Sequence, residues 1–347
     1  MPNRIRIAVA GAGVIGREHI ARVQRHPRCE LAGVIDPIPQ PGPWFAGAAA
    51  LPRVDGAIIA TPNHLHVRAA LPFLQSGVPV LIEKPLADSL AEGQRLLGFR
   101  APILAGYHRR HNPALQAAQR FVASGALGQI VAAHGMTLLH KPAEYFDVPW
   151  RTGRAGGPIL INLAHDLDML RALVGEIDTV QAVRSHAVRQ LAVEDTAAVV
   201  LTFAGGAVGT LTLSDCAVAP WSWEQTSGEN PLYARDASQD CLFLAGRQGS
   251  LALPSLRWWR QTGAPSWASP FETGRLEFEP ADPLERQLDH FCDVIEGAAA
   301  PLVCAQEALL SLDALLRVRE ATLTARDQRA AHEVVHAVPR SAGPPQE

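Results

Sequence analysis

IRIAVAGAGVIG, residues 5–16, is the stretch of sequence that decides the fold of this chain. Its first six residues alternate apolar side chains in the manner of a buried strand, and the glycines that follow predict a tight turn. A helical pattern runs over residues 17–25, and the apolar residues 31–35 predict a second strand that ends at Asp36. The order of strand, glycine turn, helix, strand and acidic residue is typical of one half of a parallel α/β sheet.

The glycines in this stretch have the spacing G-x-G-x-x-G, which in this context is the fingerprint of dinucleotide binding. Gly11 permits the tight turn, Gly13 lets a pyrophosphate approach the backbone, and Gly16 lets the helix lie close to the strand. The N–H groups at the start of the helix are free to hold the diphosphate. The residues predicted to bind it are Gly11, Gly13, Val14, Ile15 and Gly16.

Asp36 is placed to bind a ribose 2′-hydroxyl, and its carboxylate would repel the 2′-phosphate of NADP. We therefore expect NAD as the cofactor, with NADP as the weaker ligand. A nucleotide-triphosphate loop is excluded because Arg17 and Glu18 stand where that loop needs Lys and Ser or Thr. The remaining alternative is that the glycines serve only the close packing of the sheet.

The composition describes an ordinary globular protein that is too long for a single core. With 347 residues, two domains are expected. The net charge of −3 gives no electrostatic reason to expect nucleic acid or an anionic membrane as partner. No apolar run approaches the roughly 18 residues of a membrane span, and the first strand begins too early to leave room for a signal peptide.

The five cysteines are scattered, odd in number and without C-x-x-C spacing. This pattern suits reduced thiols in the cytoplasm and argues against a disulfide framework or a zinc site. We therefore expect a cytoplasmic protein without a bound metal. His64 and His66 have the H-x-H spacing of some metal sites, but no carboxylates cluster around them, so a structural or nicotinamide-side role is expected.

The first third of the chain continues to alternate strands and helices after Asp36. A proline-rich segment and one short helix over residues 44–51 come first. Strands are then predicted at 57–60, 78–82 and 103–106, and helices at 66–75 and 89–99. Two of these strands end in the polar segments TPN (61–63) and EKP (83–85). Because ligands of open parallel sheets gather at this edge, both segments are predicted to border the cofactor.

From about residue 130 the pattern changes to strand following strand. Strands are predicted at 130–140, 180–188, 196–203, 207–213, 241–245, 250–253 and 256–260, and helices at 283–296 and 305–325. Residues 219–239 predict a long loop, and loops of that length are often functional. We expect an α/β Rossmann domain with a doubly wound parallel sheet and an α+β domain with a largely antiparallel sheet. The predicted divisions are 1–113, 114–337 and a flexible tail at 338–347.

Five segments together resemble the Gfo/Idh/MocA family of NAD(P)-dependent oxidoreductases. They are the glycine turn at 11–16, ATPN at 60–63, EKP at 83–85, GYHRRHNP at 106–113, and the region from GG at 156–157 to HDLD at 165–168. The resemblance implies hydride transfer to or from secondary alcohols and carbonyls of sugars, cyclitols and related polyols. It also implies that Lys84 lies beside nicotinamide and substrate, and that His165 takes part in proton transfer.

The chain departs from the family pattern four residues before His165, where Ile161 replaces a frequent aspartate and Asn162 follows. Asn162, His165 and Asp168 would share one face of a helix, so Asn162 or Asp168 is expected to hold the imidazole instead. His165 is then the expected base for the hydroxyl proton, and Lys84 the group that polarises the substrate oxygen.

The predicted site has a cofactor side and a substrate side. Beyond the glycine turn, the predicted cofactor contacts are Asp36, Thr61, Pro62, Asn63, His66, Glu83 and Lys84, and the predicted substrate contacts are Tyr107, Arg110, Asn162 and Asp168. For three of these residues a purely structural interpretation stays open. Lys84 could be a surface lysine paired with Glu83, His165 a histidine on a helix surface, and Tyr107 a buried structural tyrosine. The basic run at 108–111 is expected to position substrate oxygens or to pair across domains.

The expected reaction is hydride transfer between NAD and a small polyol-type substrate held between the domains. Two alternatives stay open, an NAD-retaining glycosidase of the same fold and a non-catalytic cofactor-bound sensor. The run Val199-Val200-Leu201 places apolar residues on both faces of the second sheet. One face should be covered by the domain's own helices, so we expect a homodimer or homotetramer that covers the other. Internal cover by long loops, including 219–239, is the alternative.

Overall fold

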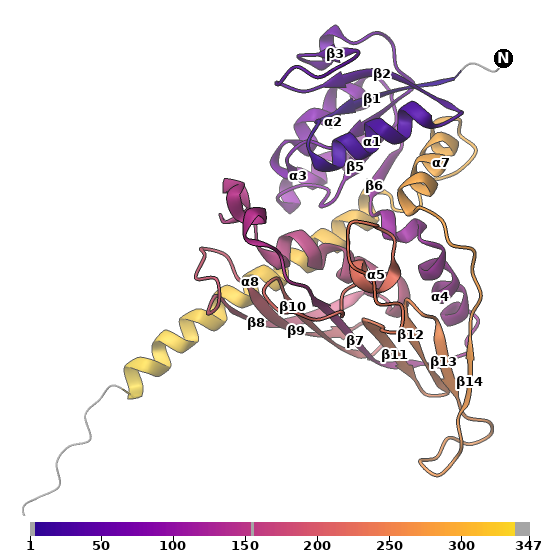
Figure 1. The fold of residues 1–347 in the computed structure, drawn as a ribbon, viewed down its shortest axis with the longest axis vertical. Coiled ribbons are helices and arrows are strands. Elements are labelled where there is room, and N and C mark those ends of the chain that lie inside the picture. Colours follow the sequence, from indigo (N-terminus) through magenta and orange to yellow (C-terminus); the bar gives the residue numbers. More distant parts are fainter. Residues whose placement is uncertain (1–3, 154–155, 337–347) are drawn as a thin grey trace, which may run out of the picture.

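The computed structural model describes residues 4–153 and 156–336, with residues 323–336 described by their helical backbone alone. Its strands form two sheets, one of six strands from the first third of the chain and one of eight strands from the remainder (Figure 1). The expected combination of a parallel sheet with a largely antiparallel one is confirmed. Within the described ranges, no helix is long and apolar enough to cross a membrane. The predicted tail at 338–347 lies outside those ranges.

The first sheet is parallel throughout, with the strand order β3-β2-β1-β4-β5-β6. Its strands are β1 (Ile5–Ala10), β2 (Cys29–Ile35), β3 (Trp44–Phe45), β4 (Gly56–Ile59), β5 (Val80–Glu83) and β6 (Ile103–Gly106). The order reverses between β1 and β4, and ligands of such sheets bind beyond the carboxyl ends of the strands at that point.

One expected element of this half is wrong. The helix expected over residues 44–51 is replaced by the two-residue strand β3 and a single 3-10 turn at Ala48–Ala50. The reason is the free edge of β2, where the N–H of Val34 donates to the carbonyl of Pro43 and so draws the segment alongside the sheet.

Helices connect the strands of the first sheet: α1 (Val14–Arg25), α2 (His66–Gln75) and α3 (Leu90–Gln94). The predicted helix at 66–75 is confirmed. The predicted helix at 89–99 is divided, because α3 passes into the 3-10 helix Arg95–Gly98. Ser89 caps α3, since its hydroxyl accepts the N–H of Glu92.

The second sheet has the order β14-β13-β12-β11-β7-β10-β9-β8. Its strands are β7 (Ile130–Leu138), β8 (Ile177–Ser185), β9 (Thr196–Phe203), β10 (Val208–Ser214), β11 (Leu242–Gly246), β12 (Gly249–Leu253), β13 (Arg257–Arg260) and β14 (Glu272–Arg275). All neighbours are antiparallel except β7 and β10, which run parallel. Strand β14 escaped prediction because its sequence, ETGR, lacks apolar alternation and it lies at the sheet edge.

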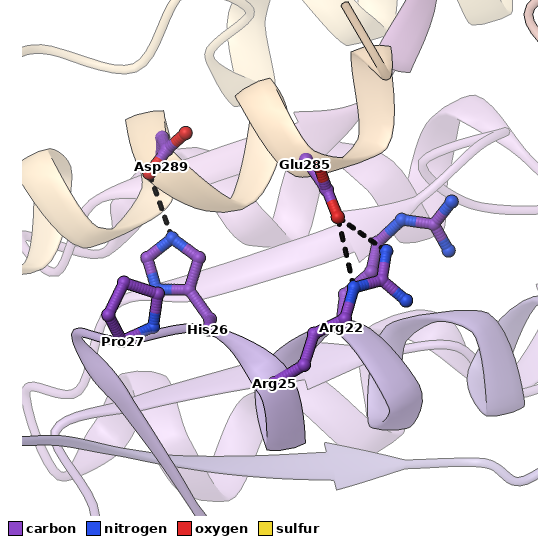
Figure 2. Close-up of a pocket in the computed structure, with 6 residues that line it drawn as sticks. All are labelled: Arg22, Arg25, His26, Pro27, Glu285 and Asp289. Atoms are coloured by element: carbon purple, nitrogen blue, oxygen red, sulfur yellow. Dashed lines mark hydrogen bonds and ion pairs between the residues drawn. The ribbon is translucent and has the colours of Figure 1, made fainter.

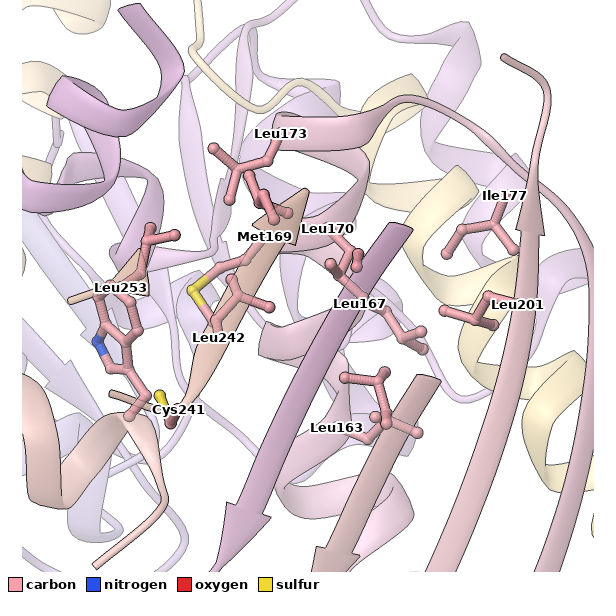
Figure 3. Packing of buried hydrophobic residues seen from close by; sticks show 14 of the residues in the cluster. Leu163, Leu167, Met169, Leu170, Leu173, Ile177, Leu201, Cys241, Leu242 and Leu253 are labelled. Carbon is pink, nitrogen blue, oxygen red and sulfur yellow. The ribbon is translucent and has the colours of Figure 1, made fainter. Parts of the chain in front are cut away.

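Three helices cover one face of the second sheet: α4 (Pro113–Ala123), α5 (Ala164–Val174) and α8 (Ala305–His336). Figure 3 shows leucines of α5 packed against strand residues such as Leu201 and Leu242. The period-2 geometry of β9 separates the two faces. Val199 and Leu201 are buried, whereas Val200 between them is 44% exposed on the face opposite the helices.

The C-terminal helices return to the first sheet. Helix α7 (Pro283–Ile295) places Phe291 in a buried cluster with Ile58, and the first turns of α8 place Leu309 in a cluster with Ile82. The division of the chain at residue 113 therefore stays a prediction, and its second part contributes helices to the core of both sheets.

Candidate active site

The glycine-rich turn joins β1 to α1 and leaves its backbone open to a ligand. Gly11 has a φ of +96°, and a Cβ there would lie 2.5 Å from the carbonyl oxygen of Ala60. A Cβ on Gly16 would overlap the carbonyl oxygen of Gly11. Nothing lies within 4 Å of a Cβ built on Gly13, and no side chain caps the N–H groups at the start of α1. The turn therefore fits the diphosphate of a dinucleotide.

Asp36 lies beside this turn, at the end of β2. Its carboxylate accepts the N–H of Ala12 at 2.7 Å and the N–H of Ile38 at 2.9 Å. Asp36 is half-buried, and the neighbouring Val14 and Ile15 keep part of their surface exposed. The carboxylate is thus fixed at the rim of the turn, where a ribose can reach it.

His66 ties together the loops that follow β4 and β5. Its Nε2 lies 2.8 Å from the carbonyl oxygen of Thr61, and its Nδ1 lies 2.9 Å from that of Pro85. Burial lowers the pKa of His66, and the two carbonyl acceptors oppose that shift. The buried ring is a link between loops, which favours the structural alternative. Pro62 and Asn63 in the same segment keep exposed surface.

Glu83, the last residue of β5, is buried. Its carboxylate lies 2.8 Å from Nε2 of His19 and accepts the N–H of Lys84 at 3.2 Å. Burial opposes ionisation, but the hydrogen bond and charge of His19 lower the pKa of Glu83. A Cβ on Gly106 would lie 2.8 Å from the Cα of Glu83, so only glycine fits there. These internal contacts fix the backbone at Lys84, and the contact of Glu83 with the cofactor stays a prediction.

Lys84 points from the sheet edge toward a π-helical turn, Ile159–Leu163, which directly precedes α5. Its Nζ donates to the carbonyl oxygen of Ile161 at 3.1 Å. Burial lowers the pKa of Lys84, the charge of Arg109 acts in the same direction, and Glu83 opposes both. The lysine is therefore an ordered component of the site and not a mobile surface residue. π-Helical turns are frequent at functional sites.

The start of the π-helical turn is held by Glu194. Its Oε1 accepts the N–H of Ile159 at 2.9 Å, and the carboxylate packs against Gly157. Gly157 has a φ of +83°, and a Cβ there would overlap Oε1 of Glu194. The glycine pair at 156–157 thus makes room for the carboxylate that anchors the turn.

Lys141 was not predicted, yet it lies in the same place. Its Nζ donates to Oδ1 of Asn162 at 2.9 Å and lies 3.9 Å from a carboxylate oxygen of Asp215. Burial lowers the pKa of Lys141 to about 8, although Asp215 opposes the shift. Lysine occurs at only two positions in the chain, 84 and 141, and both contact consecutive residues of the π-helical turn. The rarity of lysine in this sequence was the signal from which Lys141 could have been predicted as a site residue.

His165 lies in the first turn of α5 and is buried. Its ring packs edge-on against Tyr107 and His108, with centroids 6.1 and 4.8 Å away. Its Nδ1 has no hydrogen-bond partner in the part of the chain that the structure describes. Burial and the charge of Lys84 lower the pKa of His165 well below its usual value, so the ring is neutral at pH 7. Tyr107 is also buried, which favours its structural alternative.

Two expectations about the neighbours of His165 are wrong. Asn162 is engaged by a lysine, and Asp168 accepts hydrogen bonds from Arg110 at 2.7 Å and from Ser311 at 2.9 Å, so neither holds the imidazole. Arg110 and Asp168 form a buried ion pair. Each charge needs the other, since a buried charge without a partner strongly destabilises the fold. The ion pair supports a structural role for both residues, and their contact with substrate stays a prediction.

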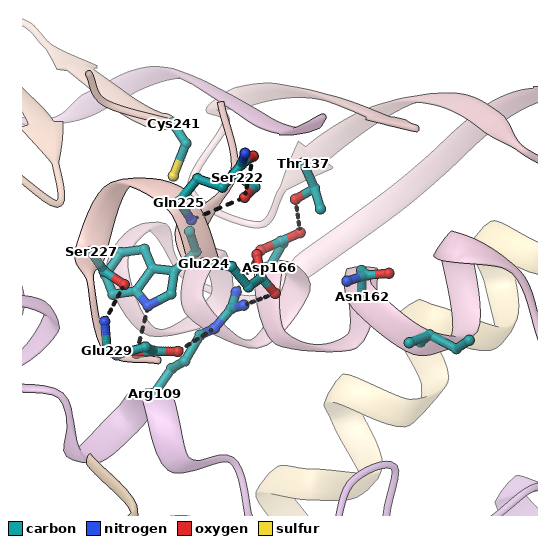
Figure 4. A network of polar contacts seen from close by, with 12 residues as sticks. Arg109, Thr137, Asn162, Asp166, Ser222, Glu224, Gln225, Ser227, Glu229 and Cys241 are labelled. Carbon is teal, nitrogen blue, oxygen red and sulfur yellow. Dashed lines mark hydrogen bonds and ion pairs between the residues drawn. The ribbon is translucent and has the colours of Figure 1, made fainter. Parts of the chain in front are cut away.

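Arg109 is the centre of a buried polar network (Figure 4). Its guanidinium donates to Asp166 at 3.0 Å and to Glu224 at 2.8 Å. Asp166 also accepts the hydroxyl of Thr137 at 2.6 Å. Burial raises the pKa of Asp166 to about 6, against the charge of Arg109. Arg109 precedes the predicted domain boundary at residue 113, and Asp166 follows it. Their ion pair is therefore of the kind expected for the basic run at 108–111, a pair across the two predicted domains.

The segment predicted as a functional loop at 219–239 contains a short helix, α6 (Trp223–Ser227), and supplies acids to this network. Glu229 accepts the indole N–H of Trp223 at 2.8 Å and the side-chain amide of Asn112 at 3.0 Å. Glu224 binds Arg109 through Oε1 only, and its Oε2 is buried without a hydrogen-bond partner among the described residues. Glu224 therefore offers one free acceptor oxygen. Its negative charge also raises the pKa of Lys84 and of Lys141, against the effect of burial.

Two family models match the chain. Residues 5–99 match the oxidoreductase family with an NAD-binding Rossmann fold, and residues 115–251 match the GFO/IDH/MocA C-terminal domain. The chain is 25% identical to 1,5-anhydro-D-fructose reductase of Ensifer adhaerens, over 79% of each chain. It is 29% identical to inositol 2-dehydrogenase 2 of Mycolicibacterium vanbaalenii, over 52% of this chain and only 57% of that relative.

Among solved structures, the fold is similar to that of the WlbA dehydrogenase from Bordetella pertussis, determined in complex with NADH and UDP-GlcNAcA. The TM-score is 0.72 at 22% sequence identity, and the match covers 92% of this chain and 97% of that one. At this identity the likeness concerns the fold.

Proposed function

The chain belongs to the Gfo/Idh/MocA family of oxidoreductases, and we propose that it transfers hydride between NAD and a secondary alcohol or carbonyl carbon of a sugar, cyclitol or related polyol. The observation that carries the proposal is the convergence of Lys84, Lys141 and His165 on one π-helical turn near the carboxyl ends of a parallel sheet. The names of the two relatives, a sugar reductase and a cyclitol dehydrogenase, support this substrate class.

The glycine turn and Asp36 fit the cofactor. When bound, NAD supplies the nicotinamide carbon that accepts hydride from the alcohol or returns it to the carbonyl. The uncapped N–H groups of α1 hold the diphosphate, and the carboxylate of Asp36 accepts a ribose hydroxyl. The same carboxylate repels a 2′-phosphate, so NAD is preferred over NADP.

His165 accepts the hydroxyl proton as hydride leaves the alcohol carbon. Without a base within hydrogen-bond reach, loss of hydride would leave a protonated carbonyl. The ring is neutral at pH 7 and is therefore able to accept a proton. In the reductive direction the same ring returns the proton to the new hydroxyl.

Lys84, Lys141, Asn162 and Glu224 bind the substrate. An ammonium group carries three N–H donors, and Lys141 gives one of them to Asn162. The remaining donors and the free Oε2 of Glu224 suit a ligand rich in hydroxyl groups, which both donate and accept. Lys84 polarises the reacting oxygen. Glu83 and Asp168 are not used as ligands because both oxygens of each carboxylate already accept hydrogen bonds from the protein, and Arg110 pairs with Asp168.

We also propose that the chain forms a homodimer or homotetramer in the cytoplasm. The face of the second sheet opposite its helices exposes Val183, Val200 and Val208 on three adjacent strands and Phe243 on β11, beyond β7. Exposed apolar patches of this kind mark association surfaces. The five cysteines are free thiols, which suits a reducing compartment.

The decisive experiment measures the formation of NADH or NADPH by the protein with each member of a panel of sugars, cyclitols, sugar acids and dihydrodiols. Each compound is tested once with NAD and once with NADP. We expect NADH formation with at least one polyol, and a lower kcat/KM with NADP. Tightly retained NAD that cleaves a glycoside without net NADH release would establish the glycosidase alternative. Cofactor binding without turnover of any panel member in either direction would favour the sensor.

A further inference from the structure

Three metal-ligating side chains lie together outside the proposed active site. His26 caps the end of α1, Cys29 begins β2, and Cys292 lies on α7. Their ligand atoms all lie within 4.8 Å of one another. The Sγ of Cys29 is 3.3 Å from the Sγ of Cys292 and 3.3 Å from Nδ1 of His26. Both cysteines are completely buried, and His26 is 9% exposed.

The two distances from Cys29 approach the edges of a metal tetrahedron. Zinc–sulfur and zinc–nitrogen bonds of about 2.3 and 2.0–2.1 Å place neighbouring ligand atoms about 3.5–3.8 Å apart. A shift of a few tenths of an ångström would bring Cys29 to that spacing from each of its two neighbours. A disulfide would instead require the two sulfurs to close to about 2.05 Å.

Asp289 orients the histidine. Its carboxylate lies 2.8 Å from Nε2 of His26 (Figure 2), whereas Cys29 lies at Nδ1. This arrangement leaves Nδ1 facing Cys29, and Nδ1 also accepts a long hydrogen bond from the backbone N–H of Arg28 at 3.3 Å, which a bound metal would displace. A carboxylate on the far nitrogen is the usual outer partner of a metal-bound histidine, because it fixes the ring and raises its basicity.

The arginines around the cluster are neutralised by acids on α7 and at its two caps. Arg22 pairs with Asp282 at 2.6 Å, and Arg25 pairs with Glu285. Arg28, the cation next in sequence to Cys29, pairs with Asp293 at 2.8 Å and with Glu296 at 2.9 Å. With their charges compensated, these arginines do not exclude a divalent cation held by two thiolates.

We propose that His26, Cys29 and Cys292 bind one thiophilic divalent cation of the zinc type, which fastens α7 to the nucleotide domain. A water molecule is the fourth ligand that completes the tetrahedron. The site is independent of hydride transfer and contains none of the predicted active-site residues. The sequence argued against zinc because its cysteines are scattered and lack C-x-x-C spacing, and only the fold brings together two of them that are 263 residues apart.

The test uses the reduced full-length protein and Co²⁺ as a spectroscopic substitute for Zn²⁺. We expect one equivalent of Co²⁺ to produce thiolate charge-transfer absorption and tetrahedral visible bands, which one equivalent of Zn²⁺ removes. Native mass spectrometry should show one bound zinc, and EDTA should lower Tm by removing it. Cys29→Ser, Cys292→Ser and His26→Gln should lose the bands and the Tm shift. Cys304→Ser, which removes a cysteine outside the cluster, should retain both.

Circular dichroism of each variant checks that it is folded, and His26→Gln keeps the test decisive if either cysteine variant unfolds. The proposal is overturned if the wild type gives no thiolate charge-transfer band or if Cys304→Ser loses it. It is equally overturned if peroxide converts Cys29 and Cys292 quantitatively into a disulfide in folded protein to which zinc does not bind, since the pair would then be a redox couple.

Discussion

Burial controls the protonation of the basic groups in the proposed site. Lys84, Lys141 and His165 each have a pKa that burial lowers, and Lys84 lowers the pKa of the other two further by its charge. Positive charge is therefore less stable at each of these positions than in water. The group that already lies in its neutral form at pH 7, His165, is the one suited to accept a proton.

Replacement of Lys84 by Met, or of His165 by Ala, should lower kcat by ~10²–10⁴-fold, the usual loss when an acid or base is removed. NAD affinity should stay nearly unchanged, because neither side chain contributes to the glycine turn. Steady-state kinetics on the substrate found in the panel, together with NAD titration, measures both effects. His134→Ala, a histidine on the open face of the second sheet, is the matched control. Parental turnover in either active-site variant would remove that residue from the mechanism.

Lys141 should impose an alkaline limit on catalysis. The pKa of its ammonium is about 8, so it carries the proton below pH 8 and loses it as pH rises through that value. We expect kcat/KM to fall above about pH 8, with the fall shifted to higher pH in Lys141→Arg, whose guanidinium stays charged. Lys141→Met should lose roughly 10–100-fold in kcat/KM at pH 7, as expected for a lost charged hydrogen bond. An unchanged pH profile in Lys141→Arg would assign the limit to another group.

At the scale of elements, the π-helical turn Ile159–Leu163 is the part that assembles the site. It receives Lys84 from the end of β5 and Lys141 from the segment after β7, and it leads directly into the first turn of α5. Its own start depends on the carboxylate of Glu194, which approaches only because Gly157 has no side chain.

Gly157→Ala should therefore lower both stability and kcat. The residue has a φ of +83°, and the new methyl group would displace Glu194 from the N–H of Ile159. We expect a loss of about 1–3 kcal/mol in the free energy of unfolding, measured by denaturant titration. Gly206→Ala has a nearly equal φ of +84° in open space, so it carries the backbone strain without the clash. If the two variants are equally destabilised and equally active, the contact with Glu194 has no role.

At the scale of the whole molecule, the second sheet has one face covered and one open. Helices α4, α5 and α8 bury the first face, while the second exposes valines on three adjacent strands among the described residues. The arrangement of Val199, Val200 and Leu201 agrees with the sequence expectation that apolar residues point to both faces.

Light scattering at micromolar concentration should give the mass of a dimer or tetramer. Val200→Glu places a charge in the middle of the open face and should shift the protein toward monomer, because a buried unpaired charge opposes association. Val218→Glu, at a position 90% exposed outside the strands, should leave the mass unchanged. A monomeric wild-type protein would contradict the assembly.

The sequence by itself determined the features that rest on local patterns. Apolar periodicity located most strands and helices, and the glycine spacing with its strand, helix and acid predicted the cofactor turn, because each depends on residues that are neighbours in the chain. The motif at 83–85 likewise placed Lys84 at the sheet edge. Where local pattern was weak, as in β14 and in the segment 44–51, the prediction failed.

Only the tertiary structure decided which side chains meet. Lys84 contacts Ile161 across 77 positions, Arg110 pairs with Asp168 across 58, and Cys29 meets Cys292 across 263. Whether a charged residue faces a ligand or a buried partner depends on what lies opposite it, and that partner is chosen by the packing of distant elements. For this reason the sequence could not show that Arg110 and Asp168 pair with each other, and it overlooked Lys141.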